Sequence, residues 1–439
     1  MTLELPDAET LLRSNDWSLD DYPRFATARR IEPTDPIEAL QARTREAIET
    51  LDLEGLPSGS RIGVTAGSRG IADVGAVLTE TVSVLADRGL EPFIIPAMGS
   101  HGGATAQGQR ETLASLGITE EAMGCPIQSS MEVEQVGTDD LGRPVYLATD
   151  ALDADGIVLV NRIKPHTDFS GPVESGLCKI GVVGLGKHRG AESFHNAGLA
   201  GEFADVLIDR ARIVLEESPI LGGIGLIEDA TERATVIEGI PARRILDREP
   251  ALLERAYEEL PMLPVEELDL LIVDRIGKDI SGTCLDTNVI GRYQFHGEEE
   301  PQVPRITRIY ARSLTPASHG NGLGIGLADF ARRDLIEAVD LEDMYINIAT
   351  SGEPSRGKLP LILPDDRTAL RLIPSTLGVS DLSEARVARI PSTLDPHRLV
   401  VSEPVAEELH GRSAVEVGPL TPLSLTGNEL ATDPYMPDQ

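Results

Sequence analysis

The order of elements along the chain is the feature that most constrains its fold. Residues 60–67 (SRIGVTAG) form an apolar run that enters a glycine-containing loop, residues 73–90 have helical spacing up to Gly89, and residues 91–97 (EPFIIPA) form the next apolar run. Strands that alternate with helices are typical of α/β folds, because neighbouring strands that run in the same direction need a crossover connection. The sequence therefore predicts an α/β fold with mainly parallel sheets.

A break marked by prolines separates two such sets of elements. Residues 260–267 (LPMLPVEE) interrupt the periodicity, and residues 268–277 (LDLLIVDRIG) begin the second set. A chain of 439 residues is also too long for one ordinary domain. We predict two α/β domains, residues 1–262 and 263–439, with the active site in the cleft between them, where the carboxyl ends of parallel strands commonly receive ligands.

Three local predictions complete the expected fold. Residues 1–35 are polar and contain prolines, so we expect an irregular lead-in. The segments GGIGLIED and ATVIEGI, between residues 222 and 240, predict an antiparallel strand pair. Residues 329–340 (DFARRDLIEAVD) have the spacing of a helix.

The net charge of −33 arises from 72 acidic and 39 basic residues, and only five of the basic residues are lysines. At molar salt the Debye length falls to about 3 Å, which screens the repulsion within so acidic a surface. We interpret the composition as halophilic, with an ordinary acidic protein as the alternative. Either interpretation argues against nucleic acid as a partner, because no basic face is available to neutralise phosphates.

The three cysteines, Cys125, Cys178 and Cys284, are widely spaced and form no CxxC pair. This pattern favours a reducing compartment over a disulfide framework or a thiolate zinc site. The N-terminal residues lack the basic and apolar regions of a signal peptide, and no run of about 18 apolar residues is long enough for a membrane span. We expect a cytoplasmic protein without a membrane partner.

Unusual residues gather in three loops that follow predicted strands. The first loop holds Ser68 and Arg69, the second holds His101 among glycines, and the third begins at Asn161. The third loop and its continuation carry three of the five lysines, which are Lys164, Lys179 and Lys187. Arginine cannot replace lysine where a deprotonatable amine is needed, because guanidinium stays charged. The lysines of this segment therefore indicate a functional site. The alternative interpretation is that they are ordinary solvated side chains.

The histidines of these loops suggest two kinds of chemistry. His101 lies among small residues, and His166 follows a proline at a predicted strand end. Two imidazoles on separate loops suit proton transfer near neutral pH, and they equally suit part of a metal site. A phosphate-binding GxxxxGK[ST] loop is absent, and no GxGxxG follows a strand, which argues against a nicotinamide-dependent dehydrogenase.

Three segments together are distinctive: MGSHGGAT (98–105), NRIKPHTDFSG (161–171) and GLCKIGVVGLGKHRGAESFH (176–195). They resemble the nickel-pincer nucleotide-dependent lactate racemase family of 2-hydroxyacid racemases and epimerases. The resemblance implies an isomerase that inverts C2 of a 2-hydroxy acid by passing a hydride from Cα to the cofactor and back. In that family the nickel is bound by sulfur, carbon and sulfur of the nucleotide and by one histidine of the protein.

The resemblance also implies a role for each matching residue. His101 and His166 would be the catalytic acid/base pair, and His195 would be the nickel ligand, with His188 as its rival. The cofactor would be tethered to Lys179. Its phosphate or carboxylate would meet Lys164, Ser170 and Lys187, and the substrate carboxylate would meet Arg69. Lys278 or Arg292 could contact the substrate in place of the charged residue that the family has and this chain lacks. The N-terminal domain would bind the cofactor, which other proteins would have to synthesise, and the C-terminal domain would close over the substrate.

The segment after LDTN departs from the family pattern. The polar Tyr, Gln and Lys expected there correspond to Ile290, Gly291 and Gln294. We therefore expect a 2-hydroxy acid other than lactate, such as a longer acid or a sugar acid. Two further classes remain open from the sequence: a divalent-metal hydrolase that uses His101, His166 and His195, and a non-catalytic cofactor-binding relative.

Overall fold

The computed structural model describes residues 5–13, 15–31, 35–68, 73–199, 201–412 and 414–436. The chain forms two compact units. The central unit is Thr34–Leu260, and the terminal unit combines Met1–Pro33 with Pro261–Gln439. Each unit has its own sheet and its own hydrophobic core, so the fold class is α/β, as the sequence predicted.

The sheet of the central unit has five strands in the order β3-β2-β6-β7-β8. These strands are β2 (Arg61–Ala66), β3 (Glu91–Pro96), β6 (Gly156–Arg162), β7 (Ile220–Glu228) and β8 (Ala234–Pro241). All pairs are parallel except β7 with β8, which confirms the predicted strands and the antiparallel pair. Most residues of β2 and β6 are buried, which is typical of parallel strands that are covered on both faces.

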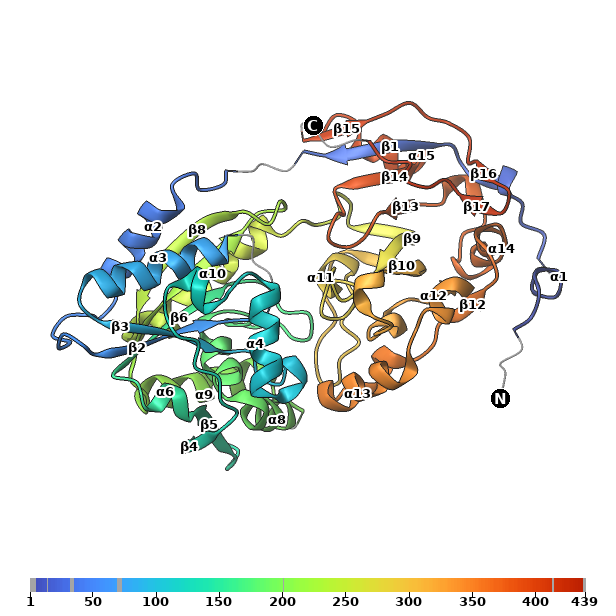
Figure 1. Cartoon of the computed structure of the whole chain (residues 1–439). Coiled ribbons are helices and arrows are strands. Elements are labelled where there is room, and N and C mark those ends of the chain that lie inside the picture. The colour runs from blue at the N-terminus through green and yellow to red at the C-terminus, as the bar shows by residue number, and fades with distance from the viewer. Residues whose placement is uncertain are drawn as a thin grey trace. The chain divides into compact units, whose positions relative to one another are not determined.

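Helices cover this sheet, with α2 and α3 on one side and α8 and α9 on the other (Figure 1). The longer helices of the unit are α2 (Leu40–Glu49), α3 (Val74–Asp87), α4 (Ala106–Ser115), α8 (Lys187–Gly198), α9 (Phe203–Glu216) and α10 (Ile245–Glu259). The predicted helix at 73–90 is confirmed as α3, and the chain turns away at Gly89, whose φ of +78° glycine adopts without steric cost. Among the described residues, no helix is both long and apolar enough to cross a membrane.

The sheet of the terminal unit has eight strands in the order β12-β11-β10-β9-β13-β14-β1-β15. Its strands are β1 (Phe25–Arg30), β9 (Glu267–Ile276), β10 (Arg305–Leu314), β11 (Phe330–Arg332), β12 (Leu361–Leu363), β13 (Val387–Ile390), β14 (Arg398–Ser402) and β15 (Val415–Val417). The four strand pairs from β12 to β13 are parallel. The three pairs β13–β14, β14–β1 and β1–β15 are antiparallel.

The expectation of an irregular lead-in is wrong for residues 25–30. They form β1, which lies between β14 and β15 although those strands come from the other end of the chain (Figure 1). Ala26 and Ala28 are buried in the core of the terminal unit. The short alternating segment FATARR is too weak a signal by itself, because its strand partners are more than 360 residues away. The first residues consequently group with the C-terminal part of the chain, rather than with the segment that follows them.

The expected helix over residues 329–340 is also wrong at its beginning. Residues 330–332 form β11, and the helix α12 covers only Arg333–Glu337. Phe330 pairs with Tyr310 of β10 and is buried in the core beneath the sheet. Burial of Phe330 and the strand hydrogen bonds outweigh the local helical spacing.

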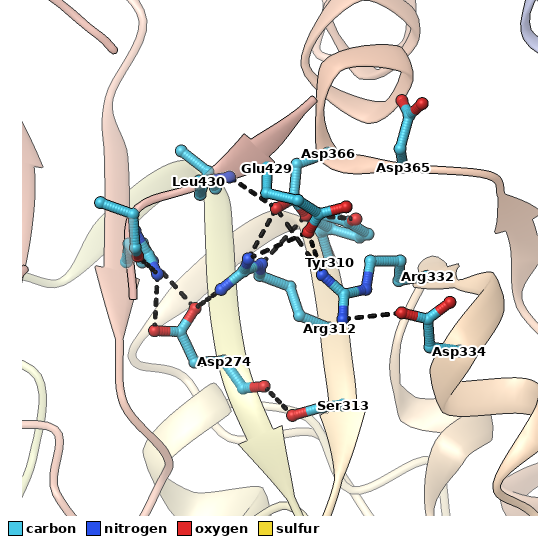
Figure 2. A network of polar contacts seen from close by, with 12 residues as sticks. Asp274, Tyr310, Arg312, Ser313, Arg332, Asp334, Asp365, Asp366, Glu429 and Leu430 are labelled. Carbon is cyan, nitrogen blue, oxygen red and sulfur yellow. Dashed lines mark hydrogen bonds and ion pairs between the residues drawn. The ribbon is translucent and has the colours of Figure 1, made fainter. Parts of the chain in front are cut away.

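A network of buried charges lies near the carboxyl ends of the parallel strands of the terminal unit (Figure 2). Arg312 of β10 bridges two carboxylates: its guanidinium is 2.6 Å from Oδ1 of Asp274 and 2.6 Å from Oδ2 of Asp366. Asp366 also accepts the hydroxyl of Tyr310 and the N–H of Leu430, each at 2.8 Å. The network therefore joins β9, β10 and the C-terminal segment through one fully buried carboxylate.

Asp366→Asn should lower the free energy of unfolding by about 3–5 kcal/mol, because Arg312 would lose a fully buried partner for its charge. Urea unfolding measures the change. Asp365→Asn is the matched control: Asp365 caps the helix α14 (Asp366–Leu372) by accepting the N–H of Thr368, a role that asparagine fills equally well. Equal losses in the two variants would contradict the importance of the buried network.

Candidate active site

The three loops that carry the predicted functional residues leave the central sheet at one edge. They follow β3, β2 and β6, which are parallel neighbours. Ala66 at the end of β2 pairs with Pro96 at the end of β3. Because neighbouring parallel strands end on the same side, the loops that carry the predicted histidines emerge side by side.

His101 is exposed in the loop between β3 and α4. Its Nδ1 lies 2.5 Å from Oγ of Ser68, which follows β2, so a side-chain contact links two of the three loops. The next residue, Gly102, has a φ of +67°, and a Cβ there would lie 2.5 Å from the backbone of Gly108. A glycine is required at this point for the loop to pack against the start of α4.

His166 is buried in the loop after β6, and its ring stacks on Phe169 with the ring centroids 4.4 Å apart. Its Nδ1 accepts the N–H of Asp168 at 3.0 Å, and its Nε2 contacts Nζ of Lys179. A neutral imidazole that accepts at Nδ1 carries its proton on Nε2. Nε2 is therefore the ring atom that faces the amine of Lys179.

Lys179 ends the short helix α7 (Leu177–Lys179), and His195 lies in the last turn of α8. Burial, and to a lesser degree the charge of Lys179, lower the pKa of His195 to about 4. His195 is therefore uncharged at neutral pH, which is the form of imidazole that binds metals. His188, its sequence rival as metal ligand, is exposed at the beginning of the same helix.

Glu174 is a member of this site that the sequence analysis missed. It is 1% exposed, and it accepts the N–H of His166 at 2.5 Å, the N–H of Gly171 at 3.0 Å and the hydroxyl of Tyr257 at 2.9 Å. Burial raises the pKa of Glu174 to about 7. The available signal was an acidic residue inside a mostly small and apolar segment, PVESGL.

Glu249 is a second buried carboxylate that the sequence analysis missed. It is fully buried on α10, where burial raises its pKa to about 7, and it accepts the N–H of Cys178 at 2.9 Å. The sequence feature that could have identified Glu249 is its position on the apolar face of the helix. Glu249 falls one turn after Ile245 and one turn before Leu252 and Leu253, all of which face the core.

Lys187, a predicted cofactor contact, is fully buried. Its Nζ donates to the carbonyl of Pro96 at 2.5 Å and to Oε1 of Gln109 at 3.1 Å, and the amide of Gln109 donates in turn to the carbonyl of Gly99 at 2.9 Å. Burial lowers the pKa of Lys187 to about 8. These contacts hold both ends of the segment that leads from β3 to His101.

The other two predicted cofactor contacts lie in the loop after β6. The backbone of Lys164 pairs with Ser175 in both directions, at 2.9 and 3.3 Å, and its side chain is half-buried. Ser170 is exposed. These two residues and His166 thus share one loop of the central unit.

The three predicted substrate contacts are placed differently. Arg69 lies outside the described residues. Lys278 belongs to the terminal unit, where its Nζ donates to the carbonyl of Gly282 at 2.6 Å and to Asn347 at 2.7 Å. Arg292 belongs to the same unit and donates to Asp329 and to the carbonyls of Leu327 and Ile306 at 2.8–3.0 Å.

Among the described residues, no group of three or more His, Cys, Asp or Glu side chains is placed so that it could hold a metal ion. The charges of Lys179, Asp168 and Arg210 act on the pKa of His195.

Lys187→Met should loosen the segment from β3 to His101, because methionine fills the space but donates no hydrogen bond. A lost hydrogen bond of about 1 kcal/mol corresponds to roughly a fivefold rise in amide exchange. Hydrogen–deuterium exchange of a peptide covering residues 98–105 measures it, and a peptide from α2 in the same variant is the control. Unchanged exchange at 98–105 would contradict this role.

The apoprotein should lose stability through His195 as the pH falls from 6.5 towards 4. The folded pKa is depressed, so the contribution is complete above 6.5 and disappears as the folded protein becomes protonated near pH 4. Between these pH values the stability difference between wild type and His195→Asn should shrink by roughly 3 kcal/mol, as measured by urea unfolding. His188→Asn is the control, because His188 is exposed, and it should leave the pH dependence of stability unchanged. The same change of stability with pH in this variant would contradict the assignment of the effect to His195.

No protein-family model matches the sequence, and no curated protein matches it significantly. The structure is similar to that of the lactate racemase apoprotein from Thermoanaerobacterium thermosaccharolyticum, with a TM-score of 0.45 and 11% sequence identity. The match covers 84% of this chain and 89% of that chain.

Proposed function

We propose that the protein is a racemase or epimerase that inverts C2 of a 2-hydroxy acid by reversible hydride transfer to a nickel-pincer nucleotide. The observation that carries the proposal is the contact of Lys179 with one imidazole, together with the effect of its charge on the pKa of another. Lys179 contacts Nε2 of His166, and its charge acts on His195. These are the three residues that the sequence resemblance assigns to the cofactor tether, the acid/base pair and the nickel ligand.

The residues present fit such a cofactor. His195 stays uncharged at neutral pH and so offers a lone pair to nickel, while Lys179 offers an amine for the tether. Lys164 and Ser170 remain candidates for the phosphate or carboxylate of the nucleotide. Lys187 does not fit that role, because its amine is buried against Pro96 and Gln109. When bound, the cofactor supplies an electrophilic centre for the hydride of the substrate Cα.

The chain itself would manage the hydroxyl proton of the substrate. Inversion requires that this proton leave while C2 becomes planar and return after the hydride has been delivered to the other face. His166 and His101 suit that task, because imidazole exchanges protons near neutral pH and the two rings stand on separate loops at one sheet edge. The hydrogen bond from Asp168 to Nδ1 leaves Nε2 as the reactive atom of His166.

Arg69 would orient the substrate, since a guanidinium binds a carboxylate through two parallel hydrogen bonds. The substrate would differ from lactate. Ile290 is fully buried, and a Cβ at Gly291 would lie 1.8 Å from the carbonyl oxygen of Pro304, so neither position offers a polar side chain to a ligand. A longer 2-hydroxy acid or a sugar acid, bound with help from Lys278 or Arg292, is the proposed substrate class.

The proposal is tested by producing the protein in a host that makes the pincer nucleotide. Nickel content and the intact mass of the chain are measured together, followed by stereochemical inversion and Cα–H exchange across a panel of 2-hydroxy acids. Stoichiometric nickel with inversion supports the proposal. Activity with a plain divalent metal and no organic cofactor would instead favour a hydrolase, and nickel binding without Cα–H exchange would favour a non-catalytic relative.

His101→Ala and His166→Ala should each reduce turnover by about 100- to 10,000-fold and leave bound nickel unchanged, because they remove proton transfer and not the metal ligand. His195→Ala should lose nickel. His188→Ala is the matched control on the same helix and should retain both nickel and turnover. Nickel lost from His188→Ala and kept by His195→Ala would reverse the two assignments.

A further inference from the structure

Helix α10 reaches both partners of the contact between His166 and Lys179. Tyr257, in the last turn of α10, donates its hydroxyl proton to Oε1 of Glu174 at 2.9 Å, and Oε2 of Glu174 accepts the N–H of His166 at 2.5 Å. Glu249, about two turns earlier on α10, accepts the N–H of Cys178, the residue before Lys179, at 2.9 Å. One helix therefore holds the backbone on both sides of this contact.

The direction of the His166 ring follows from its loop. Glu174 holds the backbone at His166 and, through the N–H of Gly171 at 3.0 Å, at the far end of the same turn. Within that turn, the N–H of Asp168 holds Nδ1, and Phe169 stacks on the face of the ring. The backbone of His166, its Nδ1 and one face of its ring are all engaged in this way. The position of Nε2 therefore depends on the bonds that Glu174 makes.

The position of Lys179 depends on Glu249 in a similar way. The carboxylate packs directly against the turn before α7, since a Cβ at Gly176 would lie 2.0 Å from Oε1 of Glu249. A buried carboxylate costs free energy unless donors compensate it, and a side chain that only filled space would be apolar. What a carboxylate adds at this position is a directed hydrogen bond to the N–H of Cys178.

We propose that Glu174, Glu249 and Tyr257 are positioning residues that set the separation between Nε2 of His166 and Nζ of Lys179. The proposal rests on the proposed function for the chemical roles of His166 and Lys179, whereas the geometry is independent of it. A displacement of about 1 Å at reacting groups costs on the order of 100-fold in rate. Loss of these bonds should therefore reduce kcat more than it changes KM.

The kinetic test uses the cofactor-loaded enzyme. Tyr257→Phe removes one of the donors to Glu174, and Tyr257 as a residue is 39% exposed, so the core is not disturbed. This variant should lower kcat about 3- to 10-fold and leave KM within about twofold, and Glu174→Gln and Glu249→Gln should lower kcat about 10- to 100-fold. A fall in kcat that only follows the folded fraction in a thermal melt would overturn the proposal.

Two variants serve as matched controls. Tyr146→Phe removes a tyrosine hydroxyl in the same unit, one that accepts from Arg189 at 3.0 Å. Glu353→Gln changes a buried glutamate of the terminal unit that accepts the N–H groups of His296 and Ser355 at 2.8 and 2.9 Å. Both should keep kcat. If the two controls lost as much kcat as Tyr257→Phe and Glu174→Gln, the effect would be one of general stability, and the positioning role would be contradicted.

A second readout separates this proposal from the proposed function. Histidine-ring NMR of the apoprotein, with the signals of His166 assigned by His166→Gln, should show a shift in Tyr257→Phe and in Glu174→Gln, while the signals of His188 stay in place. If the wild type shows no inversion but these shifts occur, the proposed function fails and the positioning role stands. If the His166 signals stay in place in both variants, the positioning role is overturned.

Discussion

Parallel pairing of β3, β2 and β6 is the constraint on which the candidate site depends. The three strands are neighbours in one sheet, and they end on the same side, so loops separated by many residues in the sequence emerge together. The contact between Ser68 and His101 links two of these loops directly. A change of strand order or direction would scatter the histidines, even with every local element intact.

Buried ionisable side chains serve different purposes in the two units. In the central unit, Glu174, Glu249 and Lys187 bond mainly to backbone groups of the loops that carry His166, Lys179 and His101. In the terminal unit, Arg312 neutralises Asp274 and Asp366 within a network that joins strands to the C-terminal segment (Figure 2). The first arrangement directs functional side chains, whereas the second compensates charge and stabilises a fold.

Local patterns predicted much of the fold. The strands at 60–67 and 91–97 and the helix between them have clear periodicity and clear ends, and the structure confirms them. Predictions failed where a distant partner decides the conformation: residues 25–30 pair with strands near the C-terminus, and Phe330 pairs with β10. Within the site, residue type alone drew attention to His166, Lys179 and His195, because lysine and histidine are rare in this chain.

The sequence by itself determined the α/β class, the acidic and lysine-poor composition and the set of chemically unusual residues, because each follows from local spacing or from counts. The tertiary structure alone decided which of those residues meet. It placed Lys179 against His166, and it buried Lys187 beneath the loop of His101. It also brought in Glu174 and Glu249, whose roles depend on backbone N–H groups that only the folded chain presents to them. Contacts of that kind depend on strand order and helix packing, which no local pattern encodes.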